Sequence, residues 1–167
     1  MKKILSLTMA LAMIGTALTG CGSKDTATQT PAENTQQTAP VQQEQSQTEK
    51  ALALINTFAT GDTDTARSLL ADGYIQHNLA YGTGADAFIG SVEYLASADV
   101  KTTVNNIRAF EDGDKVFMQT IYNFAGAGEQ VAFDIFRFDE NGKIAEHWDV
   151  METIADQSTW QNQNGKF

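Results

Sequence analysis

The chain has 167 residues, 42% of them apolar, and a formal net charge of −10 at pH 7. A surface this acidic repels the phosphates of nucleic acids and anionic lipid headgroups, which excludes both as partners held by charge. Its single cysteine excludes a disulfide within the chain and a metal site built on cysteines.

Residues 1–20 have the pattern of an export signal. Lys2 and Lys3 are followed by a mostly apolar run over residues 4–18 and then by small residues. That run is shorter than the roughly 20 apolar residues of a membrane span. Loss of residues 1–20 would remove two lysines and no acids, so the remaining chain would carry a net charge of −12.

The signal ends in Leu18-Thr19-Gly20-Cys21, which resembles the lipobox of bacterial lipoproteins. In such proteins the cysteine is lipidated and becomes the mature N-terminus. The resemblance implies a lipid on Cys21 and an extracytoplasmic protein anchored to a membrane of the bacterial cell envelope. The alternative is an ordinary secreted protein or an uncleaved anchor.

Residues 21–47 are rich in Thr, Gln and Ala and contain no aromatic residue. Such a segment cannot bury enough apolar surface to offset the entropy of ordering, so we predict a disordered tether. A flexible chain of about 26 residues spans roughly 30 Å. The rest divides into one domain at 48–152 and a polar tail at 153–167.

Helical periodicity dominates the first half of the domain. Ser46 and Glu49 have the spacing of a capping box, and the helix they begin would end at Gly61. Its predicted buried face consists of Leu52, Ile55, Phe58 and Ala59. A second helix is predicted at 63–70. A third, at 85–96, would bury Phe88, Ile89, Val92 and Leu95.

The second half alternates with the period of strands. Strands are predicted at 74–78, 100–110, 115–124, 130–138 and 143–151, the first of them lying between the second and third helices. This order predicts an α+β domain whose helices pack on one face of a strongly bent antiparallel sheet. A pocket is expected between the two layers.

The predicted hairpin at 133–150, FDIFRFDENGKIAEHWDV, is the most informative segment. Strand residues alternate between the two faces of a sheet, so His147 and Asp149 share a face. A four-residue turn would place Asp134 opposite His147. A type I turn with a bulge would place Asp134 opposite Trp148 instead. The sequence leaves both registers open.

The order of elements resembles the nuclear transport factor 2-like superfamily. The segment ADGYIQHN at 71–78 and the hairpin at 133–150 resemble its SnoaL-like group, named for a polyketide cyclase. The resemblance covers residues 49–152. It implies a cone in which three N-terminal helices pack on a strongly curved antiparallel sheet around an internal pocket.

Ketosteroid isomerase, another member of the superfamily, is similar in the same segments and favours the first register. Its buried catalytic aspartic acid matches Asp134. Its general base falls at Asn78 and its first-helix tyrosine at Leu54, neither of which can serve in those roles. The residues that match its pocket are His147, Asp149 and Met151.

Within the SnoaL-like group, a carboxylate and a histidine on the last strands supply the acid–base machinery. The resemblance implies that Asp134 or Asp149 is the acid or base, with His147 as its partner or as the oxyanion donor. Three amide side chains are predicted to orient a carbonyl group in the pocket: Gln76, Asn78 and Gln119.

Two structural alternatives stand beside this interpretation. Asp134 and His147 could form a buried ion pair without a catalytic role, or lie on the outer face of the sheet at a dimer contact. His77 has the opposite parity and is predicted to be exposed, which disfavours a metal triad of two histidines and an aspartate. We therefore expect no metal and no cofactor.

The sequence thus predicts a membrane-anchored, extracytoplasmic domain with cofactor-free acid–base chemistry of the aldol, cyclase or isomerase type on a small carbonyl compound. The alternative, from another class, is a lipoprotein that binds or senses a small hydrophobic ligand without turnover. Nucleic acid is not an expected partner. The membrane is reached through Cys21, and a homodimer through the outer sheet face is a further expectation.

Overall fold

The computed structural model describes residues 44–167. The predicted signal peptide, the predicted lipidation at Cys21 and nearly all of the predicted tether lie outside these residues. Within the part of the chain that is described, no helix has both the length and the apolar character needed to cross a membrane.

The helices and strands follow the predicted order. The helices are α1 (Gln47–Thr60), α2 (Thr63–Leu69) and α3 (Ala85–Ser97). The strands are β1 (Leu70–Gln76), β2 (Thr103–Asp112), β3 (Lys115–Asn123), β4 (Gln130–Phe138) and β5 (Ile144–Thr153). Two short 3-10 segments, η1 (Phe124–Gly126) and η2 (Gln157–Thr159), follow β3 and β5. The predicted α+β class is confirmed.

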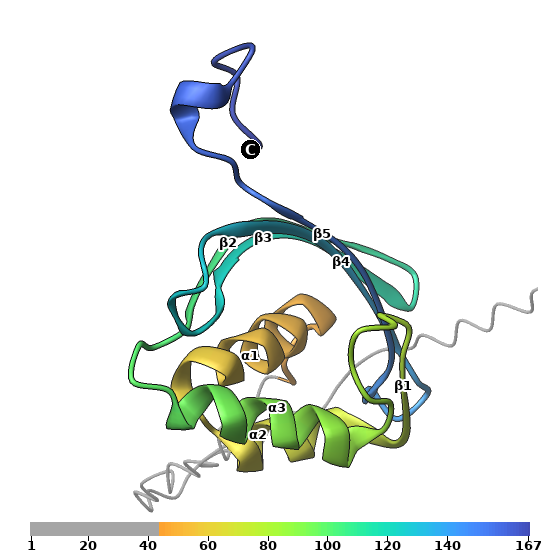
Figure 1. Cartoon of the computed structure of the whole chain (residues 1–167). Coiled ribbons are helices and arrows are strands. Elements are labelled where there is room, and N and C mark those ends of the chain that lie inside the picture. The colour runs from red at the N-terminus through yellow and green to blue at the C-terminus, as the bar shows by residue number, and fades with distance from the viewer. Residues whose placement is uncertain (1–43) are drawn as a thin grey trace, which may run out of the picture. The chain divides into compact units, whose positions relative to one another are not determined.

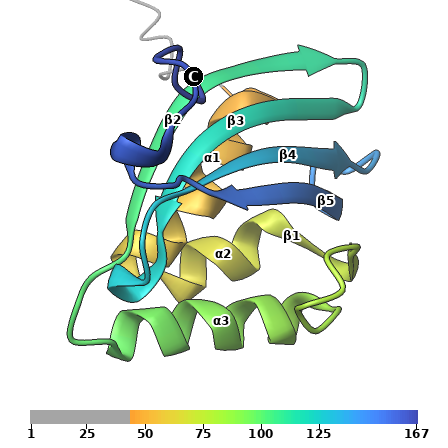
Figure 2. The same ribbon diagram turned by 45° about the horizontal axis from the view of Figure 1, so that its top comes forward.

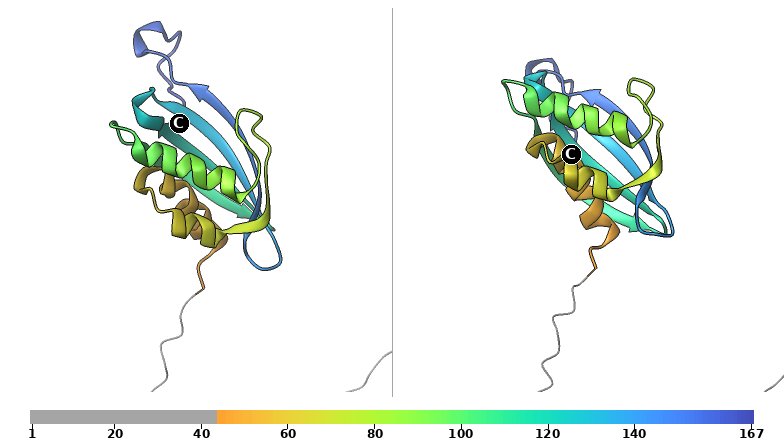
Figure 3. Two further views of the ribbon diagram at one scale, coloured as in Figure 1. Left: turned by 60° about the horizontal axis from the view of Figure 1, so that its bottom comes forward. Right: turned by 90° about the horizontal axis from the view of Figure 1, so that it is seen from below.

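The five strands form one sheet in the order β1-β5-β4-β3-β2, with β1 parallel to β5 and the other pairs antiparallel. The sheet curves around α1, while α2 and α3 lie below it (Figure 1). Figure 2 shows β2 to β5 side by side, and Figure 3 shows all three helices on the same side of the sheet. The concave face therefore looks toward the helices.

The start of α1 is the predicted capping box. The Ser46 hydroxyl accepts a hydrogen bond from the Glu49 amide at 3.1 Å, and the Glu49 carboxylate accepts one from the Ser46 amide at 2.8 Å. Gly61 ends the helix in the left-handed region, with φ 75°. Both ends of the helix are thus determined by local sequence.

The buried face of α1 differs from the predicted one. Ile55 is buried as expected, but Leu54 is fully buried and Ala59 is exposed. The helix packs against β2 and against α2 and α3 at once, so its buried stripe is turned toward Leu54. By contrast, all four residues predicted to be buried on α3 are buried.

Strand β1 begins earlier than predicted. Leu70 already pairs with Ile144 of β5, and the register is irregular between Leu70 and Ile75. The strand ends at Gln76, so Asn78 lies beyond it in the connection to α3. That connection carries Asn78 to the open end of the sheet.

The outer, convex face of the sheet carries several exposed apolar side chains, among them Phe110, Phe133 and Val150. The C-terminal tail leaves β5 on this side (Figure 1). It returns to β3, where the Lys166 carbonyl accepts a hydrogen bond from the Gln119 side chain at 2.6 Å. The homodimer through this face stays a prediction.

Gly61 provides a test of how α1 ends. Its φ of 75° is unfavourable for other residues, and an added Cβ would lie 2.8 Å from Ala96 Cβ of α3. Gly61→Ala should therefore lower the free energy of unfolding by about 1–3 kcal/mol in a denaturant titration. Gly73→Ala is the matched control, because no atom lies within 4 Å of its added Cβ. An equal loss in both variants would contradict this account.

Candidate functional site

The β4–β5 hairpin brings the three predicted catalytic residues onto one face. Asp134 lies opposite Asp149, and the neighbouring pair on that face is Phe136 with His147. Both predicted registers were therefore wrong. The predicted grouping of Asp134, His147 and Asp149 on one wall is nevertheless what the structure shows, because the observed register differs from the first one by two residues.

The register has a local cause in the turn. Asp139 accepts hydrogen bonds from the amides of Asn141 and Lys143, both at 2.9 Å, which makes a five-residue loop between Phe138 and Ile144. A bulge at Ala145 then shifts the pairing by one further residue. The two single-residue shifts restore the original parity.

Asp134 is a buried carboxylate with both oxygens occupied. Its side chain is 3% exposed. One oxygen accepts a hydrogen bond from the Tyr122 hydroxyl at 3.0 Å, and the other lies 3.1 Å from His147 Nε2. A carboxylate only accepts hydrogen bonds, so His147 must carry its proton on Nε2.

The other ring nitrogen of His147 faces Gln76. Nδ1 lies 3.1 Å from Gln76 Nε2 and 3.2 Å from Gln76 Oε1, so the amide can serve the neutral or the charged ring. The imidazole also stacks on Phe136 with ring centroids 4.4 Å apart. Both nitrogens are therefore engaged, and the ring is fixed between two neighbours.

Gln76 connects this network to the start of the α3 connection. Its Nε2 donates to the Tyr74 hydroxyl at 3.3 Å, and its Oε1 accepts from the Asn78 amide at 3.0 Å. The Tyr74 oxygen is an acceptor in the first of these bonds. Among the described residues, the Tyr74 hydroxyl donates its own proton to none.

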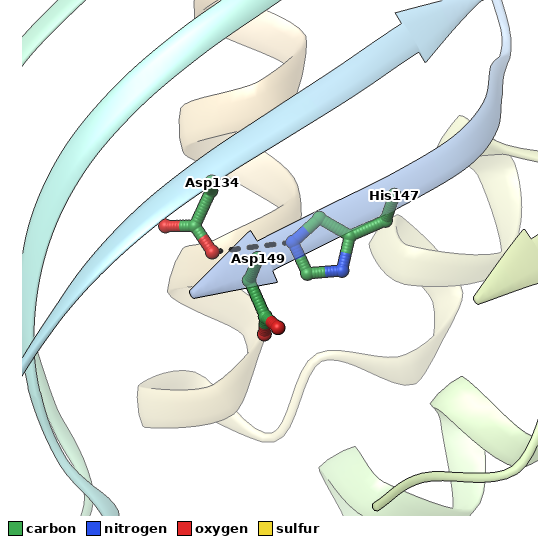
Figure 4. A group of neighbouring side chains, drawn as sticks. All are labelled: Asp134, His147 and Asp149. Carbon is green, nitrogen blue, oxygen red and sulfur yellow. Dashed lines mark hydrogen bonds and ion pairs between the residues drawn. The ribbon is translucent and has the colours of Figure 1, made fainter. Parts of the chain in front are cut away.

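Asp149 differs from Asp134 in its partners. One of its oxygens accepts a hydrogen bond from Asn78 Nδ2 at 2.7 Å, and the other accepts none from the described residues. Burial raises the pKa of the Asp149 carboxyl, while attraction to His147 and the bond from Asn78 oppose this rise. Figure 4 shows the carboxylate pointing away from the bonded Asp134–His147 pair.

Two tyrosines share the environment of these carboxylates. Burial and the charge of Asp149 raise the pKa of Tyr74, and burial and the charge of Asp134 raise that of Tyr122. Both hydroxyls therefore keep their protons over the physiological pH range. Tyr122 uses its proton to hold Asp134, and Tyr74 has its proton available.

These groups line a cavity of about 780 Å³ between the sheet and the helices. Its volume lies within the range of about 300–1,000 Å³ that is usual for small-molecule sites. Tyr81 and Tyr94, both lining residues, are about half exposed and largely exposed. The other lining residues used below are Phe58, Tyr74, Gln76, Phe88, Tyr122, Phe124, Asp134, His147, Asp149 and Met151.

Three predicted positions lie away from the cavity or only at its edge. Gln119 is buried on the convex face under the tail, so its prediction as a pocket residue was wrong. Strand alternation places it with Phe133 rather than with Asp134. His77 is exposed, as predicted, and stacks on Trp148. Asn78 reaches the site through its bond to Asp149.

Tyr74 and Tyr122 are site residues that the sequence interpretation missed. Alternation along β3 places Tyr122 on the same face as Met118, but that this face is the one of Asp134 follows only from the observed register of β3 and β4. Tyr74 and Gln76 are two residues apart in the predicted strand at 74–78, so they were expected to share a face. Tyr74 was overlooked because tyrosine in a strand also serves well as packing.

A divalent metal ion has an incomplete set of ligands at this site. One ligand atom from each of Asp134, His147 and Asp149 can be chosen so that all three lie within 4.8 Å of one another. However, both oxygens of Asp134 and both nitrogens of His147 already take part in hydrogen bonds. A metal ion would have to replace these bonds and would find a single free oxygen on Asp149.

Sequence comparison identifies the family. The SnoaL-like domain matches residues 51–147, which is more than half of the chain. The chain therefore belongs to the SnoaL-like family. No curated protein is similar enough in sequence to give a match.

Solved structures share the fold at low sequence identity. An NTF2-like protein of unknown function from Cytophaga hutchinsonii is 15% identical, with a TM-score of 0.57, over 67% of this chain and 95% of that one. TsrD from Streptomyces laurentii is 19% identical with a TM-score of 0.54, over 63% and 87%. An LEH-like epoxide hydrolase of M. tuberculosis is 18% identical with a TM-score of 0.54, over 62% and 80%. These likenesses support the nuclear transport factor 2-like fold.

The raised pKa of Asp149 predicts an effect on stability. The folded state holds this proton more tightly than the unfolded state, so stability is lost as pH rises through the raised pKa. Asp149→Asn removes that loss and keeps an oxygen for Asn78. The variant should melt at the same or a higher temperature than the unmodified protein at pH 7, and its advantage should shrink toward pH 3. A lower melting temperature at pH 7 would show that the carboxylate stabilises the fold.

Proposed function

We propose that this domain performs cofactor-free acid–base chemistry on a small carbonyl compound, with Asp149 as the group that exchanges the proton. The observation that carries the proposal is the pairing of two available groups in one cavity. Asp149 has a free oxygen, and Tyr74 has a hydroxyl proton that no described residue accepts. A general base and an oxyanion donor are the two groups that enolisation requires.

The chemistry follows from these two positions. The Tyr74 hydroxyl donates a hydrogen bond to the carbonyl oxygen of the substrate. Asp149 removes a proton from the neighbouring carbon, and the electron pair moves to the oxygen to form an enolate. The enolate carbon then attacks a second carbonyl carbon, whose oxygen takes the proton back from Asp149. Where the substrate has a neighbouring double bond, the dienolate takes that proton back at another carbon instead. The first outcome is an aldol or cyclisation reaction, and the second is an isomerisation.

Asp134 and His147 have a supporting role in this proposal. Each uses its polar atoms on protein partners, so neither offers a free atom to a substrate. Together they present a fixed, polar wall beside Asp149. The raised pKa of Asp149 also brings that carboxyl closer to the pH at which a proton is exchanged in both directions.

The family supports this class of reaction. Neighbours in structure include IdmH of Streptomyces antibioticus and a protein of Bacillus cereus, each named as a candidate polyketide cyclase. What these names state concerns those proteins. For this chain the support lies in family membership together with the two available groups in its cavity.

Binding without turnover is the second candidate function. Its specific support is that Asn78, an amide, stands where a related isomerase has its base. Most polar groups on this wall of the cavity are also hydrogen bonded to one another. A protein that only binds a ligand needs the cavity but does not need polar groups that are free of hydrogen bonds.

Proton exchange separates the two candidates. The protein is incubated in D2O with a panel of small ketones and aldehydes, and loss of the hydrogen next to the carbonyl is followed by NMR. We expect exchange that falls about 100-fold or more in Asp149→Asn and about 10-fold or more in Tyr74→Phe. Asp99→Asn, an exposed change of the same type, should keep the full rate. Saturable binding without any exchange would favour the binding function.

We further propose that the protein is held at the cell envelope by a lipid on Cys21. The support is the lipobox-like sequence that ends the apolar run. Cys21→Ser should move the protein from the membrane fraction to the soluble fraction, because the remaining chain is too acidic to be held by anionic headgroups. The two fractions are compared by immunoblot. Retention of the variant in the membrane fraction would contradict a lipid anchor.

A further inference from the structure

The charges that face the cavity do not balance. Its lining includes two carboxylates, Asp134 and Asp149, and one imidazole, His147. Among the described residues, no lysine and no arginine lines it. With both carboxylates ionised, the cavity keeps at least one negative charge even when the imidazole is protonated. An anionic ligand would therefore enter against repulsion and find no cationic partner.

The same cavity is also lined by aromatic rings from helices α1 and α3, strands β1 and β3, and η1. Five lining rings follow one another in contact, in the order Tyr74, Phe88, Phe58, Phe124 and Tyr122. The distances between successive ring centroids run from 4.9 to 6.0 Å. Two of these contacts are edge-to-face, Tyr74 with Phe88 and Phe58 with Phe124. We call these five residues the aromatic arc.

One end of the aromatic arc contacts a carboxylate, because Tyr122 donates a hydrogen bond to Asp134. The other end, Tyr74, lines the same cavity as Asp149, and the charge of Asp149 contributes to the raised pKa of Tyr74. Negative charge and aromatic rings are thus combined in one cavity. Such a combination attracts organic cations, which gain from ring faces as well as from opposite charge.

We infer that the natural ligand of this cavity carries a positively charged nitrogen, as a protonated amine or a quaternary ammonium group, on an apolar body. The inference rests on the proposed function, since it takes the same cavity as the ligand site. In a substrate, the carbonyl group on Tyr74 and the cationic nitrogen near the rings of Phe58 and Phe124 would be separate parts of one molecule.

An inorganic cation fits the same observations less well. A divalent metal ion needs several free oxygen or nitrogen ligands, and here only one oxygen of Asp149 is free of hydrogen bonds from the described residues. The aromatic arc contributes nothing to a metal ion of this kind. The cavity is also far larger than a metal ion requires.

Three matched probes test the inference: 3-phenylpropylamine, 3-phenylpropan-1-ol and 3-phenylpropanoate. They share an apolar body and differ in charge. Binding to the protein is measured by calorimetry at pH 7.5. We expect the amine to bind about 10-fold or more tightly than the alcohol, and the carboxylate to bind most weakly. Equal or tighter binding of the alcohol or the carboxylate would overturn the inference, and so would failure of all three probes to bind.

Two variants locate the preference. Asp149→Asn should reduce the affinity for the amine about fivefold or more while leaving the alcohol nearly unchanged, whereas Asp99→Asn should alter neither. Phe124→Leu should weaken the amine more than the alcohol, with its melting temperature confirming that it folds. A preference that survives both cavity variants would contradict the inference.

The outcomes also separate this inference from the proposed function. Proton exchange on neutral carbonyl compounds, without a preference for the amine, would overturn the cationic ligand and leave the acid–base function standing. Preference for the amine without proton exchange would overturn the acid–base function and leave the cationic ligand standing. Stoichiometric binding of Zn²⁺ or Mn²⁺ alone, reversed by a chelator and lost in Asp149→Asn, would identify a metal site and overturn the inference.

Discussion

The structure depends on a carboxylate that is almost completely buried. Asp134 is 3% exposed, and a buried carboxylate is costly unless donors surround it. Its two donors, Tyr122 and His147, lie on β3 and β5, the strands on either side of β4. Gln76 of β1 then holds the other side of the imidazole. The hydrogen bonds that begin at this carboxylate thus connect side chains of four adjacent strands on the concave face.

This arrangement leaves the second carboxylate in a different condition. Asp149 lies two residues from His147 on the same strand, yet its donor comes from Asn78, outside the sheet. One of its oxygens remains available, and burial raises its pKa. Asp134 and Asp149, which lie opposite each other in one hairpin, therefore have different roles. Asp134 is fixed by its partners, and Asp149 is left able to react or to attract a charge from outside.

Sequence alternation was sufficient to place His147 and Asp149 on one face, because the period of a strand does not depend on its partner, but it left the face of Asp134 open. Alternation does not determine the register of β4 and β5, because the bulge at Ala145 depends on how the Asp139 loop closes. Gln119 was predicted to lie in the pocket, and its place on the outer face follows from the register of β3 and β4, which the sequence did not determine. The buried face of α1 differs from the predicted one because several elements pack on this helix, so that residues outside the predicted face are buried as well. Long-range contacts of this kind have no local sequence signal.

The difference between the two aspartates is the central claim, and a carboxyl NMR titration measures it directly. With the side-chain carboxyl carbons observed from pH 2 to 8, the pKa of Asp149 should lie above the ordinary value for aspartic acid. It should rise further in Asn78→Ala, which removes the hydrogen bond that favours the charged form. A pKa of Asp149 at or below the ordinary value, or one unchanged by loss of the Asn78 amide, would contradict the account.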